Sequence, residues 1–82
     1  MFIYLWDACH FHGVTDDAGR AREAAAACIV GGFASGARVE SALLVSGFAH
    51  ITYGYERTGQ GWQGQGKDGH VTWRRFASQV AS

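Results

Sequence analysis

Apolar side chains first gather in residues 2–7, where aromatic and β-branched residues run as far as Asp7 and predict a strand. Residues 8–14 break this pattern, and we interpret them as a connector that ends around Gly13. Residues 18–30 are mostly Ala, Arg and Glu, which favour a helix. The first third of the chain is therefore expected to form a strand, a connector and a helix.

Both ends of the expected helix carry start and stop signals. Thr15, Asp16 and Asp17 offer oxygens that can cap the first backbone amides. Gly31 and Gly32 stop the helix at its other end. Between them an apolar stripe recurs at spacings of three and four residues, formed by Ala18, Ala21, Ala25, Cys28 and Ile29. Because these side chains are mostly small, the helix can lie close against a sheet.

The second half of the chain is dominated by alternating patterns. Residues 38–45 fit either a helix or a strand, and we expect a strand because the segment is short and lies between Gly36 and Gly47. Residues 50–57 alternate well, with Ile51, Tyr53 and Tyr55 on one face. Residues 58–61 are expected to form a turn and residues 62–65 a short strand. Residues 66–69 carry the Asp-Gly signal of a hairpin turn, residues 70–76 form the last strand, and residues 77–82 are a frayed tail.

The expected order is strand, helix, strand and then a meander, β-α-β-β-β. This is an α+β fold with one helix packed on a mostly antiparallel sheet. A chain of 82 residues makes a single small globular domain, 1–82. With 48% hydrophobic and 17% charged residues it is not of the disordered class, and it has no apolar run long enough for a membrane span.

The opening segment and the cysteines bear on location. Residues 1–6 are apolar, but they lack a basic start and are followed by Asp7, so we expect no signal peptide and a cytoplasmic protein. Two cysteines are too few for a disulfide scaffold and are expected to be reduced.

Candidate catalytic or metal-binding residues are few. Cys9, His10 and His12 are the most suggestive cluster, but their spacing matches no common metal motif and no orienting group accompanies them. Residues 59–64 match the string G-x-G-x-x-G, yet they link two expected strands, so we reject a dinucleotide site there. These glycines are expected instead to relieve crowding around the turn, or to leave room for Trp62 or a neighbouring aromatic ring.

The formal net charge of zero argues against a generic polyanion binder, although residues 1–49 carry −2 and residues 50–82 carry +2. The positive half is also rich in aromatic rings, a mixture typical of sheets that stack single-stranded nucleic acid, but the same rings can fill a core or an interface. Alternation puts Trp73 and Arg75 on one face of the last strand and Arg74 and Phe76 on the other. The candidate binding residues, for a partner protein or for nucleic acid, are Tyr53, Tyr55, Arg57, Trp62, Lys67, Trp73, Arg74 and Arg75.

Three segments carry a family resemblance: residues 13–17 (G-V-T-D-D), residues 38–40 (R-V-E), and residues 55–62 (Y-E-R-T-G-Q-G-W) with residues 69–73 (G-H-V-T-W). In these motifs the chain resembles short uncharacterised hypothetical proteins of actinobacteria. Residues 63–66 (Q-G-Q-G) depart from the pattern, because in that group this stretch is often rich in Arg. The resemblance implies a lineage and no particular chemistry.

One helix cannot cover both faces of a sheet with this many aromatic side chains. We therefore expect a small non-enzymatic interaction protein that acts through its sheet, by self-association or by binding another protein. The alternative is a nucleic-acid-binding accessory or regulatory protein that uses the basic and aromatic C-terminal meander. We expect no catalytic residue, no metal and no cofactor.

Overall fold

A computed structural model describes residues 2–46 and 53–77. Within them the chain forms five strands and one helix. Their bounds are β1 Phe2–Ala8, β2 Phe11–Thr15, α1 Ala18–Val30, β3 Gly36–Ser46, β4 Tyr53–Lys67 and β5 His70–Ala77. The helix in this part of the chain is too short to cross a membrane.

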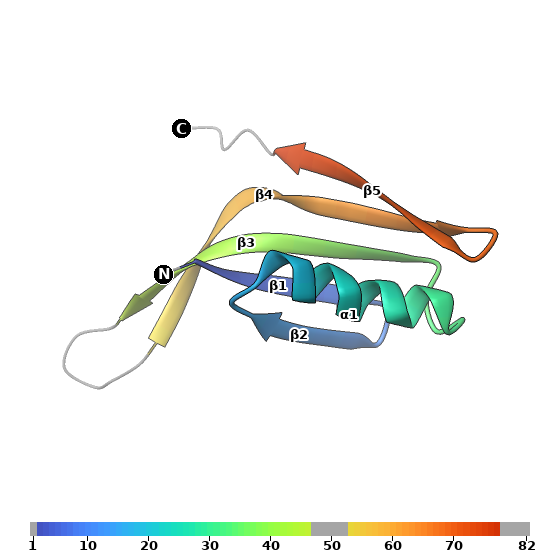
Figure 1. The fold of residues 1–82 in the computed structure, drawn as a ribbon. Coiled ribbons are helices and arrows are strands. Elements are labelled where there is room, and N and C mark those ends of the chain that lie inside the picture. The colour runs from blue at the N-terminus through green and yellow to red at the C-terminus, as the bar shows by residue number, and fades with distance from the viewer. Residues whose placement is uncertain (1, 47–52, 78–82) are drawn as a thin grey trace.

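All five strands belong to one antiparallel sheet in the order β2-β1-β3-β4-β5, and α1 lies along one face of it (Figure 1). The predicted α+β fold, with one helix on a mostly antiparallel sheet, is confirmed. The ambiguous residues 38–45 lie inside β3 and are extended, as expected. Of the predicted tail at 77–82, Ala77 belongs to β5, and residues 78–82 lie outside the described residues, as do residues 50–52 of the predicted strand.

Two details of the prediction are wrong. The expected connector at 8–14 contains β2, which pairs with β1 through a two-residue turn at Cys9 and His10. Cys9 takes the positive φ of 60° that this turn needs, a conformation more typical of Gly. The expected turn at 58–61 does not end a strand either, because β4 continues through it with a shift in register opposite Ser41.

The helix forms where its signals predict it. The carboxylate of Asp17 caps the first turn by accepting from the backbone amides of Gly19 at 2.8 Å and Arg20 at 3.2 Å. Gly31 ends the helix by donating its N–H to the carbonyl of Ala27. The predicted apolar stripe faces the sheet and is buried at Ala21, Ala25 and Ile29.

Between α1 and the sheet lies a core of small side chains, which includes Ala8, Ala37 and Val39. Two indole rings cover glycines on the neighbouring strand: a Cβ at Gly13 would collide with Trp6, and a Cβ at Gly64 would collide with Trp73. The expectation that glycines in residues 59–64 leave room for an aromatic ring is thus confirmed at Gly64.

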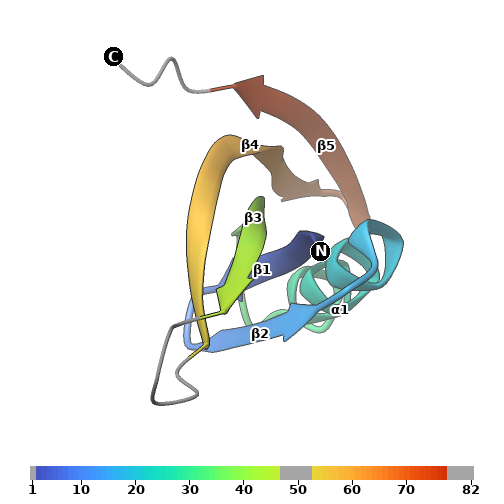
Figure 2. The same ribbon diagram turned by 90° about the vertical axis from the view of Figure 1, so that its left-hand side faces the viewer.

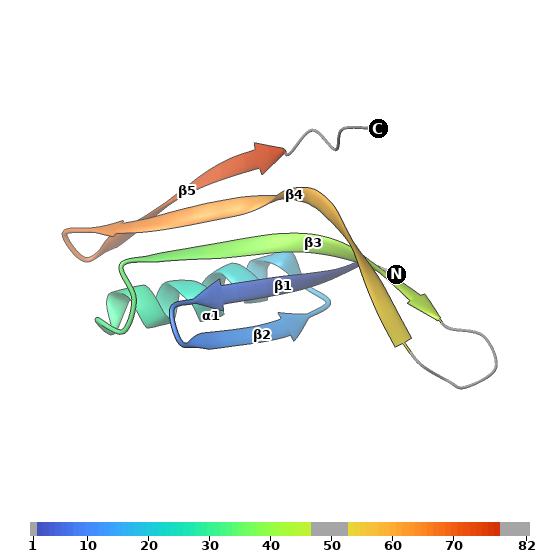
Figure 3. The ribbon, with the colours of Figure 1, turned by 180° about the vertical axis from the view of Figure 1, so that it is seen from behind.

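The sheet curves around the helix, so that β5 and β2 lie at the two ends of an arc with α1 inside it (Figure 2). Seen from behind, no described element covers the other face, and the far ends of β3 and β4 extend beyond β1 and β2 (Figure 3). We call this uncovered side the open face. Its chemistry differs from that of the helix side, as the register of the strands makes clear.

Candidate functional site

Alternation along each strand assigns side chains to the open face. Since Trp6, Val39 and Trp73 pack in the core under α1, their sequence neighbours point the opposite way. One row of the open face crosses all five strands as register partners, in the order His12, Asp7, Arg38, Gln63 and Arg74. The row beside it contains Val14, Leu5, Glu40, Gly61 and Phe76. The open face is therefore polar along one row and mixed along the next.

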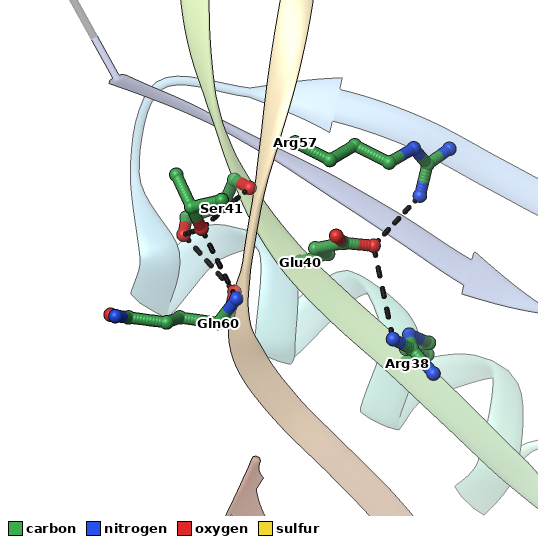
Figure 4. A network of polar contacts seen from close by, with 6 residues as sticks. Arg38, Glu40, Ser41, Arg57 and Gln60 are labelled. Carbon is green, nitrogen blue, oxygen red and sulfur yellow. Dashed lines mark hydrogen bonds and ion pairs between the residues drawn. The ribbon is translucent and has the colours of Figure 1, made fainter. Parts of the chain in front are cut away.

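Glu40 is a buried carboxylate on this otherwise exposed face, with only 6% of its surface accessible. Arg57 donates from Nη1 to its Oε1 at 2.8 Å, and Nη2 of Arg38 lies 3.9 Å from the same oxygen. Figure 4 shows the two guanidinium groups reaching Glu40 from different sides. Because burial of an unpaired carboxylate is costly, these two arginines are what allows Glu40 to sit inside the sheet surface.

A β-bulge brings Arg57 close to Glu40. The partner of Glu40 on β4 is Gly61, whereas Ala42, two residues on, pairs with Arg57, so β4 contains two extra residues. Gly59 supports the bulge with a φ of 77°. The hydroxyl of Ser41 bonds to that of Thr58 and donates to the carbonyl oxygen of Gln60 at 3.0 Å (Figure 4). The bulge thus redirects β4 so that Arg57 can reach back over the face.

Each of the two arginines also lies over an aromatic ring. The guanidinium of Arg38 is 4.2 Å from the ring centre of Phe76, and that of Arg57 is 5.9 Å from the ring centre of Tyr55. The hydrogen bond to Glu40 is the main cause that raises the pKa of Arg57 above its ordinary value. Two rings, two cations and one carboxylate therefore form a continuous chain of contacts from β5 to the far end of β4.

Two shallow hollows flank this chain of contacts. One, of about 300 Å³, is bounded by apolar walls that include Leu5, Val14 and Tyr55 and by the charged groups of Asp7, Arg38, Glu40 and Arg57. Another, of about 200 Å³, is lined by Gln63, Gln65, Thr72 and Arg74. The charges around the larger hollow are mixed, with two carboxylates and two guanidinium groups.

The predicted binding residues are divided between the two faces. Tyr55, Arg57 and Arg74 lie on the open face, whereas Trp62, Trp73 and Arg75 lie on the helix side. Lys67 is the last residue of β4 beside the hairpin turn, and Tyr53 is the first residue of β4. Together these residues do not make one continuous platform.

The sequence reasoning missed Arg38, Glu40 and Phe76, which belong to the same open-face chain of contacts as Arg57. The alternation of residues 38–45 was the available signal, since it puts Arg38 and Glu40 on one face of a strand. What the sequence lacks is any sign of the bulge that bridges them to β4.

The cysteine and histidine cluster is dispersed by the β1–β2 turn. Cys9 and His10 are exposed in the turn itself, and His12 lies on the open face. Within residues 2–46 and 53–77 no three His, Cys, Asp or Glu side chains gather in a way that could hold a metal ion.

Arginine and aromatic side chains also meet on the helix side. Trp62 lies beneath two guanidinium groups, that of Arg22 from α1 at 4.7 Å and that of Arg75 from β5 at 5.6 Å from the ring centre. Tyr4 lies beside it with ring centres 6.3 Å apart.

No family model, curated protein or solved structure matches the chain, so the function of the open face and of the helix side has to follow from their own chemistry.

Proposed function

We propose that the protein is a non-enzymatic interaction protein that binds a second copy of itself through the open face. The observation that supports this most is the polar row Asp7, Arg38, Gln63 and Arg74. It has a carboxylate near one end and a guanidinium at the other. Such a row can complement itself when it is turned by a two-fold rotation.

The required rotation has its axis along the strands, between β3 and β4. It lays β3 of one copy over β4 of the other, and β1 over β5. Arg38 then faces Gln63 of the second copy, and Asp7 faces Arg74. Because the sheet curves away from this axis, the outer pair depends on the length of the Arg74 side chain. Every contact in the row occurs twice, as an isologous interface requires.

The next row agrees with the same arrangement. It places Leu5 over Phe76, so that one apolar side chain meets another. Glu40 faces Gly61, whose missing side chain leaves space above the network of Arg38 and Arg57. Aligned packing of two sheets about 10 Å apart is a common arrangement of antiparallel sheets. The mixed charges around the larger hollow also suit a partner with the same mixture better than a uniformly charged one.

Sedimentation equilibrium over a concentration series tests the proposal. We expect the mass to fall from two chains to one on dilution. Arg74→Glu should shift the equilibrium toward the single chain. Arg75→Glu makes the same charge change on the next residue but on the helix side, and should leave the equilibrium unchanged. A single-chain mass for the unmodified protein at every concentration, or equal effects of the two variants, would refute the proposal.

A further inference from the structure

The helix side contains a further hollow, of about 210 Å³, between the start of β1 at Phe2 and the middle of β4 at Trp62. It is lined by Phe2, Tyr4, Ser41, Gln60, Trp62 and Arg75. We call it the Trp62 corner. It opens on the side of the sheet opposite to the proposed interface, so a ligand there would not compete with a second copy.

The Trp62 corner is electropositive. The guanidinium groups of Arg22 and Arg75 lie over the same indole ring, although like charges repel each other. Among the described residues, the ion pairs formed by arginines involve Arg38 and Arg57 with Glu40, and neither Arg22 nor Arg75 has a carboxylate partner. None of the described residues that line this hollow carries a carboxylate. An anion placed there would gain a charge-assisted contact with Arg75, which lines the hollow, without displacing an existing ion pair.

Aromatic surface is available next to these charges. Phe2 is 56% exposed although it lies at the rim of the hollow, and the ring of Tyr4 is half-buried between Phe2 and Trp62 along the same side of the sheet. An exposed ring beside a cation is the combination that binds a base through its flat face and a phosphate through its charge. The side chain of Gln60 extends away from the bulge and adds a neutral donor and acceptor (Figure 4).

We propose that the Trp62 corner binds a nucleotide, with the base against Phe2 and Tyr4 and the phosphate against Arg75. Trp62 is then a positioning residue, because its ring holds the guanidinium group of Arg75 at the hollow. This mode of binding, by aromatic rings and an arginine, differs from phosphate binding by a glycine-rich loop. Such a loop is followed by a helix, whereas residues 59–64 lie inside strand β4.

Isothermal titration calorimetry with four probes tests the site: AMP, adenosine, inorganic phosphate and a single-stranded oligonucleotide of deoxythymidine. We expect AMP or the oligonucleotide to bind at least about tenfold more tightly than adenosine or phosphate alone, because each of these provides only half of the contacts. Stronger binding of the oligonucleotide, lost steeply with added salt, assigns the site to single strands. Equal or stronger binding of AMP assigns it to free nucleotides. Absence of binding by both overturns the proposal.

Adjacent arginines provide the matched control. Arg75→Gln should weaken binding by about tenfold through the loss of one charged contact, whereas Arg74→Gln on the open face should leave it unchanged. Trp62→Leu should weaken binding and Trp62→Phe should restore part of it, since a ring again supports the guanidinium groups. Equal weakening by Arg74→Gln and Arg75→Gln would show non-specific charge attraction and overturn the site. If the unmodified protein binds nucleotide but has a single-chain mass at every concentration, the proposed function alone is refuted.

Discussion

Arg57 and Glu40 form a 2.8 Å ion pair although they are not register partners. Arg57 is opposite Ala42, and Glu40 is opposite Gly61. The bulge in β4 closes the distance between them, and Gly61 leaves the space above Glu40 that a side chain would otherwise fill. The geometry of one irregularity in the backbone therefore decides where the charges of the open face lie.

Arg57→Gln tests the contribution of this pair to stability. It leaves the buried carboxylate of Glu40 with Arg38 alone, at 3.9 Å. Since the side chain of Arg57 is 56% exposed, solvent screening reduces the loss, and we expect about 1 kcal/mol of unfolding free energy. Urea denaturation followed by tryptophan fluorescence measures it. Arg20→Gln, at an exposed arginine of α1 outside the proposed interface, should change stability by less than about 0.5 kcal/mol; similar losses in both variants would contradict this role for the pair.

The ion pair should be insensitive to alkaline pH over the ordinary working range. Its hydrogen bond to Glu40 raises the pKa of Arg57. A raised folded-state pKa gives stability that is fully present below the unfolded-state pKa and is lost only as the pH rises through the folded one. The stability difference between the unmodified protein and Arg57→Gln should thus stay constant from about pH 7 to about pH 10, since arginine stays charged there. A difference that disappears within this window would exclude the charged pair as its source.

Gly61 should not tolerate a side chain. A Cβ at this position would collide with the backbone of Val39 and Glu40, which cannot move as a flexible side chain can. We expect Gly61→Ala to lower the unfolding free energy by about 2 kcal/mol or more. At Gly19 a Cβ meets only the carboxylate of Asp17 at 3.1 Å. Gly19→Ala is therefore the control and should be neutral or stabilising by about 0.5 kcal/mol. Equal losses at Gly61 and Gly19 would show that the close approach of β3 and β4 is not the cause.

The two consecutive aspartates before α1 should differ in importance. Asp17 accepts two backbone N–H groups of the first turn. Asp17→Ala is expected to cost about 1 kcal/mol, a typical value for the loss of an N-cap. Asp16→Ala removes the same charge without removing a cap and should cost no more than a few tenths of a kcal/mol. Thermal unfolding followed by circular dichroism separates the two cases, and an equal effect would point to charge instead of capping.

Much of the fold could be predicted from the sequence because its signals are local. The cap at Asp17, the small-residue stripe of α1 and the Asp-Gly turn each depend on a few neighbouring residues. At that turn Asp68 and Gly69 both have positive φ, as a two-residue hairpin requires. The opposite faces of Arg74 and Arg75 also followed from simple alternation.

The missed features depend on partners far away in the chain. Phe11–Thr15 is too short and too polar to be recognised as a strand without β1 beside it. Glycines in residues 58–61 are expected both in a turn between two strands and in a bulge within one strand. Only the pairing of this segment with Glu40 and Ser41 of β3 shows that it is a bulge. The ion pair between Arg57 and Glu40 depends on that bulge, and so the candidate site could be predicted only in part.

Mixing two charge variants tests whether Asp7 of one copy faces Arg74 of another. Asp7→Arg alone should place two arginines opposite each other, and Arg74→Asp alone should place two aspartates opposite each other. An equimolar mixture restores both pairs of opposite charges in a heterodimer. We expect sedimentation equilibrium to give single chains for each variant alone and two-chain particles for the mixture. A mixture whose mass equals the average of the two variants measured separately would contradict the account.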